Sequence, residues 1–463
     1  MLNFFKVNDP FRLFGILAYL VVFGVISLIF FSFPTTVPTL LWMVLGERLS
    51  EGYYLYVDVI DDTGPLSAGV FTGLHLLFGR SEFVYLFLGR ILALFQIYYW
   101  NSTLIKYRVF DENTYLPAII MTALFHFSFD LMSLSPTLLG STFLMLALGQ
   151  LFSHTVLQKE SSESTLLIGL FGGLATGFHW NFVFFLPFLV FTGLAISSFT
   201  IRQLFLSIMG FTVPLLLILV FYFWNDGLTQ ALSLLPLLFS YPKYSYHDYL
   251  SWLPPGSLAL ALALAGFFIG SFFRGATINQ QKQRQLVLSW LLFSAGFFFL
   301  VKTSASYQLV VFIPGLTYLI TQFFLYFNWT LLLRPLFFAF TLAVPLWGMT
   351  YWNARTSTDS KYFVPSSSEA TPSDKAQVMV LGADCSPYLS ATLGGPFLNY
   401  QMSKSYLNQE KTLQQKAQLF QMLRQQTPKR VLDQEGLFRQ LLEELPALKE
   451  YYVEASPGVF TKK

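Results

Sequence analysis

Acidic residues gather in one stretch of the chain, residues 34–82, which lies between two long apolar segments. They are Glu47, Glu51, Asp58, Asp61 and Asp62. Carboxylates grouped in this way can act as a general base, hold a divalent metal, or simply face solvent. Loops held on a rigid scaffold often carry functional groups, which draws attention to this one. From the residues alone all three interpretations stay open.

Part of this stretch predicts a helix at a membrane surface. Residues 38–50 are amphipathic and end before Gly52, a residue type that commonly follows a helix C-terminus. The polar face carries Glu47 and Arg48. The expected apolar face consists of Leu41, Val44, Leu45 and Leu49.

The elements that must position these acids are membrane helices. The chain is 54% hydrophobic and 11% charged, about half the charged fraction of a soluble domain. A helix needs about 20 apolar residues to cross a bilayer. The sequence therefore predicts an all-α polytopic membrane protein with about eleven transmembrane helices. The expected spans are 12–33, 83–105, 115–129, 137–157, 164–178, 181–199, 204–224, 256–273, 286–301, 308–327 and 335–353. If 164–199 is one bent helix, everything after it inverts.

The apolar segment 65–79 decides the orientation, because Lys and Arg in short loops favour the cytoplasmic side. If this segment lies on the surface, the basic residues expected inside are Lys6, Arg12, Lys106, Arg108, Lys159, Arg202, Arg274, Lys282, Arg284 and Arg334. Those expected outside are Arg48, Arg80, Lys243 and Lys302. If this segment instead spans the membrane, most of the basic residues of the chain's short loops fall on the outside. We therefore predict a cytoplasmic N-terminus, an outside loop at 34–82, and an extracytoplasmic C-terminus.

The composition changes after residues 1–353. Residues 354–374 form a polar, Ser/Pro-rich linker, and residues 375–463 predict a small C-terminal α/β domain. KAQVMVLG and RVLD are typical of strands, and a third strand is expected at the end. LNQEKTLQQKAQLFQMLRQQ and EGLFRQLLEELPALKEYY have helical periodicity. The net charge of +3 gives no reason to expect nucleic acid, and the single Cys385 excludes an intrachain disulfide.

The order of residues in the first loop resembles the GT-C membrane glycosyltransferases, in particular the branch of protein O-mannosyltransferases and aminoarabinose transferases. That family shows a "G…Y-x-D…PPL" signature, then "FG-x-S" and an Arg near the start of the next span. Here the corresponding residues are Gly52, Tyr56, Asp58, Pro65, Leu66, Phe78, Gly79, Ser81 and Arg90. Lys302, Tyr307 and Pro314 are similar to the family's entry to a late span.

The resemblance implies transfer of a sugar from a polyprenyl-phosphate carrier on the outer face. Arg90, Lys302 and Tyr307 are then the expected contacts of the lipid phosphate. At the place where the family carries its catalytic acid this chain has Pro38 and Thr39, and Gly64 replaces the first proline of "PPL". A second family acid falls near Leu134, with Asp130 a turn earlier. Glu47 and Asp58 are the best remaining catalytic acids. Asp61, Asp62 and Asp130 are candidates for a metal or acceptor side.

Three hypotheses remain from the sequence. The first is an envelope glycosyltransferase in the bacterial inner membrane that uses a polyprenyl-linked sugar, with a divalent metal as the only candidate cofactor. The second is a degenerate GT-C-like scaffold that binds an envelope protein partner, which the missing acids favour. The third is a transporter, which the scarcity of charge inside the expected spans disfavours.

Overall fold

The computed structural model describes residues 1–31, 33–157, 162–272, 276–327, 329–356, 358, 361–364 and 376–463. The chain forms two compact units, each built from three separate segments. Unit 1 comprises residues 1–33, 85–217 and 247–355, and unit 2 comprises residues 34–84, 218–246 and 356–463. Much of the predicted linker 354–374, and the expected inside charges Lys159 and Arg274, lie outside the described residues. The separate C-terminal domain stays a prediction.

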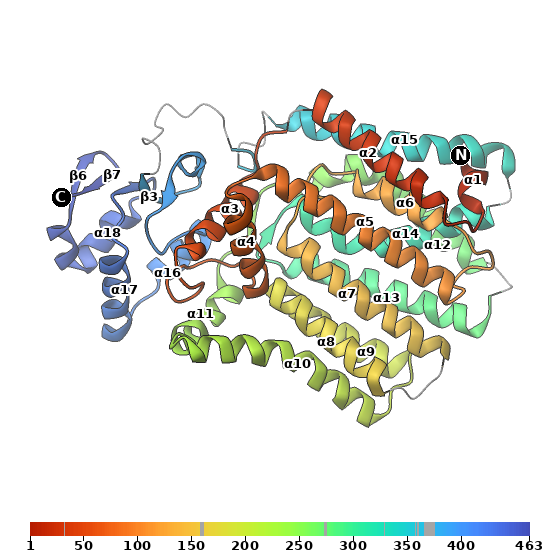
Figure 1. Cartoon of the computed structure of the whole chain (residues 1–463), viewed down its shortest axis with the longest axis horizontal. Helices are drawn as coiled ribbons and strands as arrows, with labels where there is room; N and C mark the ends of the chain where they lie inside the picture. The colour runs from red at the N-terminus through yellow and green to blue at the C-terminus, as the bar shows by residue number, and fades with distance from the viewer. Residues whose placement is uncertain are drawn as a thin grey trace. The chain divides into compact units, whose positions relative to one another are not determined.

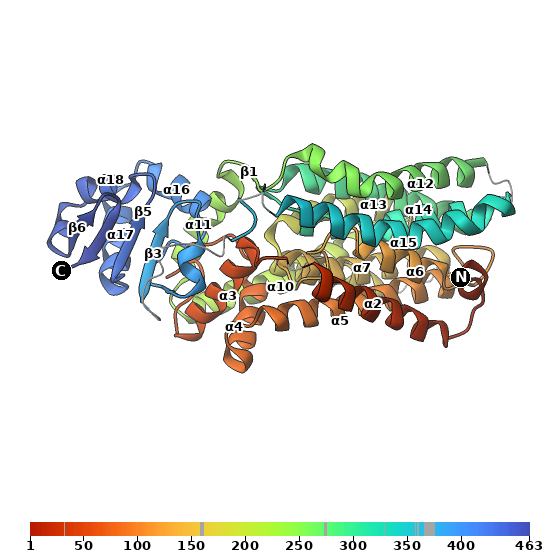
Figure 2. The same cartoon turned by 90° about the horizontal axis from the view of Figure 1, so that it is seen from above.

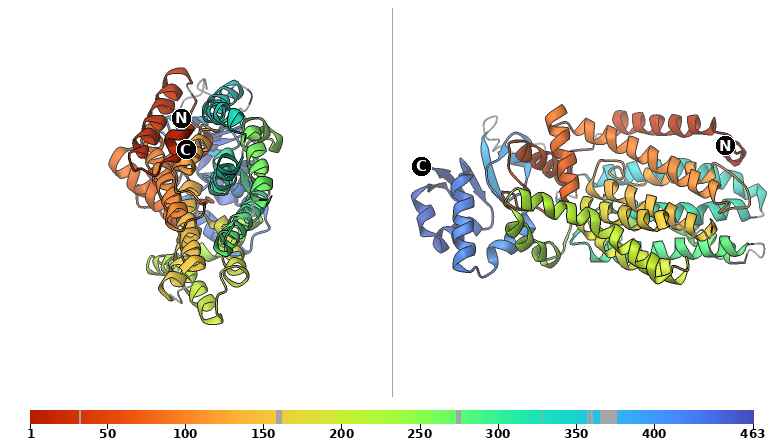
Figure 3. Two further views of the ribbon diagram at one scale, coloured as in Figure 1. Left: turned by 90° about the vertical axis from the view of Figure 1, so that its right-hand side faces the viewer. Right: turned by 60° about the horizontal axis from the view of Figure 1, so that its bottom comes forward.

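Unit 1 is helical, and its long helices run side by side (Figure 1, Figure 3). Two of its helices continue into unit 2, namely α5 at its start and α10 at its end. The α-helices are α1 (Leu2–Lys6), α2 (Arg12–Phe30), α5 (Glu82–Lys106), α6 (Leu116–Phe125), α7 (Pro136–Leu157), α8 (Ser162–Phe178), α9 (Phe185–Ala195), α10 (Ile201–Trp224), α12 (Leu253–Phe272), α13 (Ile278–Leu300), α14 (Ile313–Tyr326) and α15 (Thr330–Arg355). Short elements are η1 (Trp180–Phe184), η2 (Tyr249–Trp252), β2 (Thr303–Ser304) and η3 (Ser306–Phe312).

Within the described part of the chain, eight helices are long and apolar enough to cross a membrane. They are α2, α5, α7, α10, α13, α15, and α12 and α14 together with the 3-10 turns before them. The protein is therefore a multi-pass membrane protein, as predicted. Helix α6 has ten residues, α8 has 17, and α9 has 11. Since these are shorter than the span length of about 20 residues, the count of eleven spans stays a prediction.

Glycines bring neighbouring helices of unit 1 into close contact. A side-chain carbon added at Gly169 or Gly173 of α8 would collide with backbone carbonyls of α10, those of Ser207 and Phe211. An added carbon at Gly210 of α10 would meet the carbonyl of Leu166 in return. Small residues at this spacing let membrane helices approach closely, which maximises dispersion contacts where no hydrophobic effect drives association.

Unit 2 combines helices with a five-stranded sheet in the order β4-β3-β5-β7-β6. Figure 2 shows its strands β3, β5 and β6 beside helices α16, α17 and α18. Strands β3 (Gln377–Leu381), β4 (Thr392–Leu393) and β5 (Arg430–Asp433) run parallel, and β7 (Val459–Lys462) is antiparallel to β5 and to β6 (Tyr452–Ser456). The other elements are α3 (Val37–Ser50), α4 (Pro65–Phe78), α11 (Leu228–Ser240), β1 (Tyr244–Ser245), η4 (Ser386–Leu389), α16 (Tyr400–Asn408), α17 (Leu413–Gln425), α18 (Leu437–Glu444) and η5 (Pro446–Glu450).

The structure confirms the strands predicted at KAQVMVLG and RVLD, the helix α17, and the strand expected at the end. The segment EGLFRQLLEELPALKEYY holds a shorter helix than expected, α18, followed by the 3-10 turn η5. Helix α16 and strand β4 are not predicted from the sequence. Helix α4 has 14 residues, too few to cross a bilayer as a straight helix; the surface position expected for 65–79 stays a prediction.

Backbone hydrogen bonds join the first loop to the C-terminal segment inside unit 2. The N–H of Val37 donates to the carbonyl of Tyr362 at 2.8 Å, and that of Val364 donates to Thr35 at 2.9 Å. Further along, the N–H of Ile60 donates to the carbonyl of Pro396 at 2.7 Å. Segments some 300 residues apart in the sequence thus satisfy one another's backbone groups.

Candidate functional site

Helices α3 and α4 form the frame of the first loop. The hydroxyl of Thr36 accepts the N–H of Thr39 and caps α3, and Gly52 follows the helix end with φ +96°. A side-chain carbon added at Gly46 would lie 2.5 Å from the carbonyl oxygen of Phe71, so only glycine permits this approach of α3 to α4. The predicted helix and its glycine stop are confirmed.

The expected polar face of α3 was wrong for Arg48, which is only 2% exposed. Its guanidinium donates to Glu51 at 2.6 Å and to the side chain of Gln426 at 3.0 Å, and it lies over the ring of Tyr53. The C-terminal segment supplies Gln426 and covers this side of the helix. The hydrophobic periodicity of a 14-residue helix depends only on its own residues, so it cannot predict burial of Arg48 by the distant Gln426.

Glu47, one of the two predicted catalytic acids, is held in an ion pair. Arg80 donates to its carboxylate, and another nitrogen of Arg80 donates to the carbonyl of Tyr388 at 2.6 Å. Both side chains of the pair are about one-fifth exposed. The carboxylate of Glu47 is therefore engaged by a cation of unit 2 and holds α3 to the segment after α4.

Asp61 and Asp62 also bond inside unit 2. Asp61 is buried and accepts the N–H of Thr63 at 2.9 Å. Burial, assisted by the charge of Asp62, raises the pKa of Asp61 to about 7. The two oxygens of Asp62 accept from the hydroxyl of Tyr241 at 2.7 Å and from the amide of Asn399 at 2.8 Å.

Asp58 lies in a tight loop whose geometry is strained at Tyr56. Tyr56 has φ +64°, a conformation that a bulky side chain rarely adopts, and it is 1% exposed with its hydroxyl donating to the carbonyl of Thr63. Such strain persists only where the surroundings enforce it, and it gathers at functional sites. The carboxylate of Asp58 accepts the N–H of Tyr54 at 2.8 Å.

Two further contacts fix this loop from outside. The amide of Gln426 donates to the carbonyl of Asp58 at 2.8 Å while its oxygen accepts from Arg48. Gly227, just before α11, approaches Val57 so closely that an added side-chain carbon would lie 2.5 Å from it. The loop, α11 and the C-terminal segment therefore meet at Asp58.

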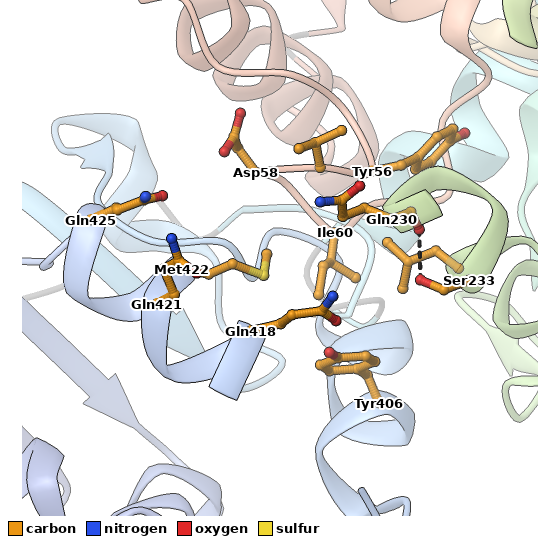
Figure 4. A pocket seen from close by; sticks show the side chains of 12 residues that line it. Tyr56, Asp58, Ile60, Gln230, Ser233, Tyr406, Gln418, Gln421, Met422 and Gln425 are labelled. Atoms are coloured by element: carbon orange, nitrogen blue, oxygen red, sulfur yellow. Dashed lines mark hydrogen bonds between the residues drawn. The ribbon is translucent and has the colours of Figure 1, made fainter. Parts of the chain in front are cut away.

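A pocket of about 230 Å³ opens beside this loop (Figure 4). Figure 4 shows Asp58 and Gln425 toward one side of it and Tyr406 and Gln418 toward the other. The loop, α11, α16 and α17 contribute its lining: Tyr56, Val57, Asp58, Ile60, Gln230, Ser233, Leu234, Tyr406, Gln418, Gln421, Met422 and Gln425. Of the predicted site residues only Asp58 lines it.

The predicted phosphate contacts belong to unit 1. Arg90 lies about two turns into α5, next to Gly24, and its charge interacts with His126. Its Nε is buried without a hydrogen-bond partner, and the guanidinium pairs with no acid among the described residues. Lys302 is half-buried and likewise makes no hydrogen bond or ion pair in the described part of the chain.

Asp130 is tied to the segment that carries Tyr307. Its two oxygens accept from the hydroxyls of Ser128 at 2.6 Å and Ser306 at 2.5 Å. Tyr307, the residue after Ser306, is buried. Throughout the described ranges, no three His, Cys, Asp or Glu side chains group closely enough to hold a metal. The hypothesis of a metal at Asp61, Asp62 and Asp130 therefore gains no support from their arrangement.

Sequence reasoning missed Arg80 and the glutamines of α17. Arg80 was counted only for its charge, although it follows "FG" directly. The run LQQKAQLFQMLRQ did contain a signal, because glutamines recur on one helix face there.

Comparison with known proteins finds no family model and no curated protein that matches this chain.

Proposed function

We propose that this chain is a multi-pass glycosyltransferase-like protein that transfers a sugar from a polyprenyl-phosphate carrier to an envelope acceptor on the extracytoplasmic face. The observation that supports this proposal most directly is that Arg90 pairs with no acid among the described residues, although it lies in a helix long and apolar enough to cross a membrane.

A cation within a membrane span is costly unless an anion accompanies it. No carboxylate in the described ranges accompanies Arg90, and its Nε has no hydrogen-bond partner there. A carrier lipid brings its phosphate into the membrane from the side, and a guanidinium binds phosphate through charge-assisted hydrogen bonds. We assign Lys302, which makes no ion pair in the described part of the chain, as the second cation in this role.

Asp58 is the acid that we assign as the general base. It belongs to the Tyr56–Asp58 part of the signature and lines a pocket, whereas Glu47 is neutralised by Arg80. In the proposed reaction Asp58 takes the proton of an acceptor hydroxyl, whose oxygen attacks the anomeric carbon of the sugar. The polyprenyl phosphate leaves with the bonding electrons.

A lipid-binding experiment tests the carrier. The full-length protein in nanodiscs is titrated with a polyprenyl phosphate, and binding is followed by intrinsic tryptophan fluorescence. We expect Arg90→Gln to weaken binding at least tenfold, the effect of losing a charged hydrogen-bond donor, and Arg90→Lys to retain part of it. Lys106→Gln, at the other end of α5, is the matched control. Equal binding by wild type and Arg90→Gln contradicts the proposal.

A second candidate is a scaffold without catalysis, because Glu47, Asp61 and Asp62 all make contacts inside unit 2. Envelope glycans of a deletion strain are compared after complementation with wild type, Asp58→Asn and Glu47→Gln. The transferase proposal expects the wild type to restore a glycan, Asp58→Asn to lose it, and Glu47→Gln to retain it in proportion to folded protein. Full function of Asp58→Asn, with a stoichiometric protein partner on purification, establishes the scaffold instead.

A further inference from the structure

One face of helix α17 is directed at the pocket beside Asp58. Gln418, Gln421, Met422 and Gln425 recur at intervals of three and four residues, so they lie along one side of the helix. Leu419 and Leu423 are fully buried on the other side. The helix is anchored by its leucines and presents a row of amides to the cavity.

These amides have unused hydrogen-bonding capacity. Gln418, Gln421 and Gln425 make no side-chain hydrogen bond with any residue in the described ranges. Across the pocket, the buried Oε1 of Gln230 also lacks a partner there. Each amide can donate and accept at once, which matches a ligand with neighbouring hydroxyl groups.

The charge and size of the pocket restrict the ligand further. Asp58 is the only acid in its lining, and the lining contains no Lys, Arg or His. A phosphate or uronate would therefore meet a like charge without a counter-ion. The volume of about 230 Å³ is below the roughly 300–1,000 Å³ of pockets for drug-sized molecules, and the half-buried ring of Tyr406 adds an apolar surface.

We infer that this pocket binds a ring of an uncharged saccharide, with the amides of Gln418, Gln421 and Gln425 bonding its hydroxyls and Tyr406 contacting its apolar face. Because the lining residues include no cation, the pocket suits the sugar of the acceptor and not the phosphate-bearing donor. Only this acceptor role rests on the proposed function; the binding itself does not.

The test is saccharide binding without any lipid donor. Full-length protein in nanodiscs is examined by saturation-transfer NMR and calorimetry with maltotriose, cellotriose and chitotriose, and with trigalacturonate as the anionic probe. We expect at least one neutral trisaccharide to bind, and trigalacturonate to bind at least tenfold more weakly. Gln421→Ala/Gln425→Ala removes two exposed amides and is expected to weaken binding about tenfold or more. Gln414→Ala/Gln440→Ala removes two exposed amides outside the pocket and leaves binding unchanged.

The inference is overturned if no neutral trisaccharide binds, if the pocket variant binds as tightly as its control, or if trigalacturonate binds equally well. Its failure is distinct from that of the proposed function. Saccharide binding in a chain that transfers no sugar supports the pocket and contradicts the transferase. Sugar transfer without saccharide binding in this pocket supports the transferase and contradicts the pocket.

Discussion

At the level of single residues, the most consequential group in unit 2 is the buried carboxyl of Asp61. Glu47 pairs with the cation Arg80 and Asp62 accepts from Tyr241 and Asn399, while Asp61 accepts hydrogen bonds from Thr63 beside the like charge of Asp62. Burial of a carboxylate in such surroundings opposes folding unless the group takes up a proton.

We therefore expect Asp61→Asn to stabilise unit 2 at pH 8. The folded pKa of Asp61 is raised to about 7, above the unfolded value of about 3.9. The cost of its burial is absent below the unfolded pKa, grows as pH rises, and is complete above the folded pKa. The gain should be on the order of 1–3 kcal/mol at pH 8 and smaller at pH 5, with Asn still able to accept from Thr63.

Cys385 provides the measurement for this prediction. It is the only cysteine and is buried, and burial raises the pKa of its thiol to about 12. It should react with a thiol dye only as unit 2 opens, so the temperature of reaction reports stability. Glu410→Gln, an exposed acid, is the control. If the reaction temperatures of Asp61→Asn and wild type differ by the same amount at pH 8 and pH 5, the raised pKa of Asp61 is contradicted.

At the level of elements, the contact of α3 with α4 depends on Gly46. We expect Gly46→Ala to destabilise unit 2 by about 1–3 kcal/mol, because the added carbon would force the backbone at Phe71 to move. Gly69→Ala on α4 has open space around it and should stabilise by about 0.5–1 kcal/mol through helix propensity. The same cysteine assay measures both. Equal effects of the two substitutions would show that α3 and α4 do not meet at Gly46.

The elements also show what could be predicted from the sequence. Helix α3, its end at Gly52, the strands β3 and β5 and most long helices follow from local patterns that act over a few turns. The burial of Arg48 against Gln426 and the pairing of Glu47 with Arg80 depend on residues far along the chain, so no local pattern encodes them. The candidate site was therefore predicted only in part. Asp58 does line a pocket, but most of the amides that line it come from α17, where periodicity indicates only a helix.

For the whole molecule, the charge bias predicts that the segment around Lys159 and the C-terminal end lie on opposite faces of the membrane. A fluorescent-protein fusion after Lys159 should fluoresce in the cytoplasm, and an alkaline-phosphatase fusion after Lys463 should be active outside. The reciprocal pair of fusions, with the two reporters exchanged, should both be silent and serves as the control. Reporters active on one common face would require a different number of spans.

The division of unit 2 among three distant segments has a consequence for biogenesis. The ribosome releases residues 34–84 and 218–246 well before residues 356–463, so the partners of Val37 and Ile60, and Asn399, one of the two partners of Asp62, arrive last. Until then the first loop has unsatisfied backbone groups and an uncovered Arg48. A chain that ends before residue 356 should therefore insert in the membrane but be degraded by quality-control proteases, as a subunit without its partner is.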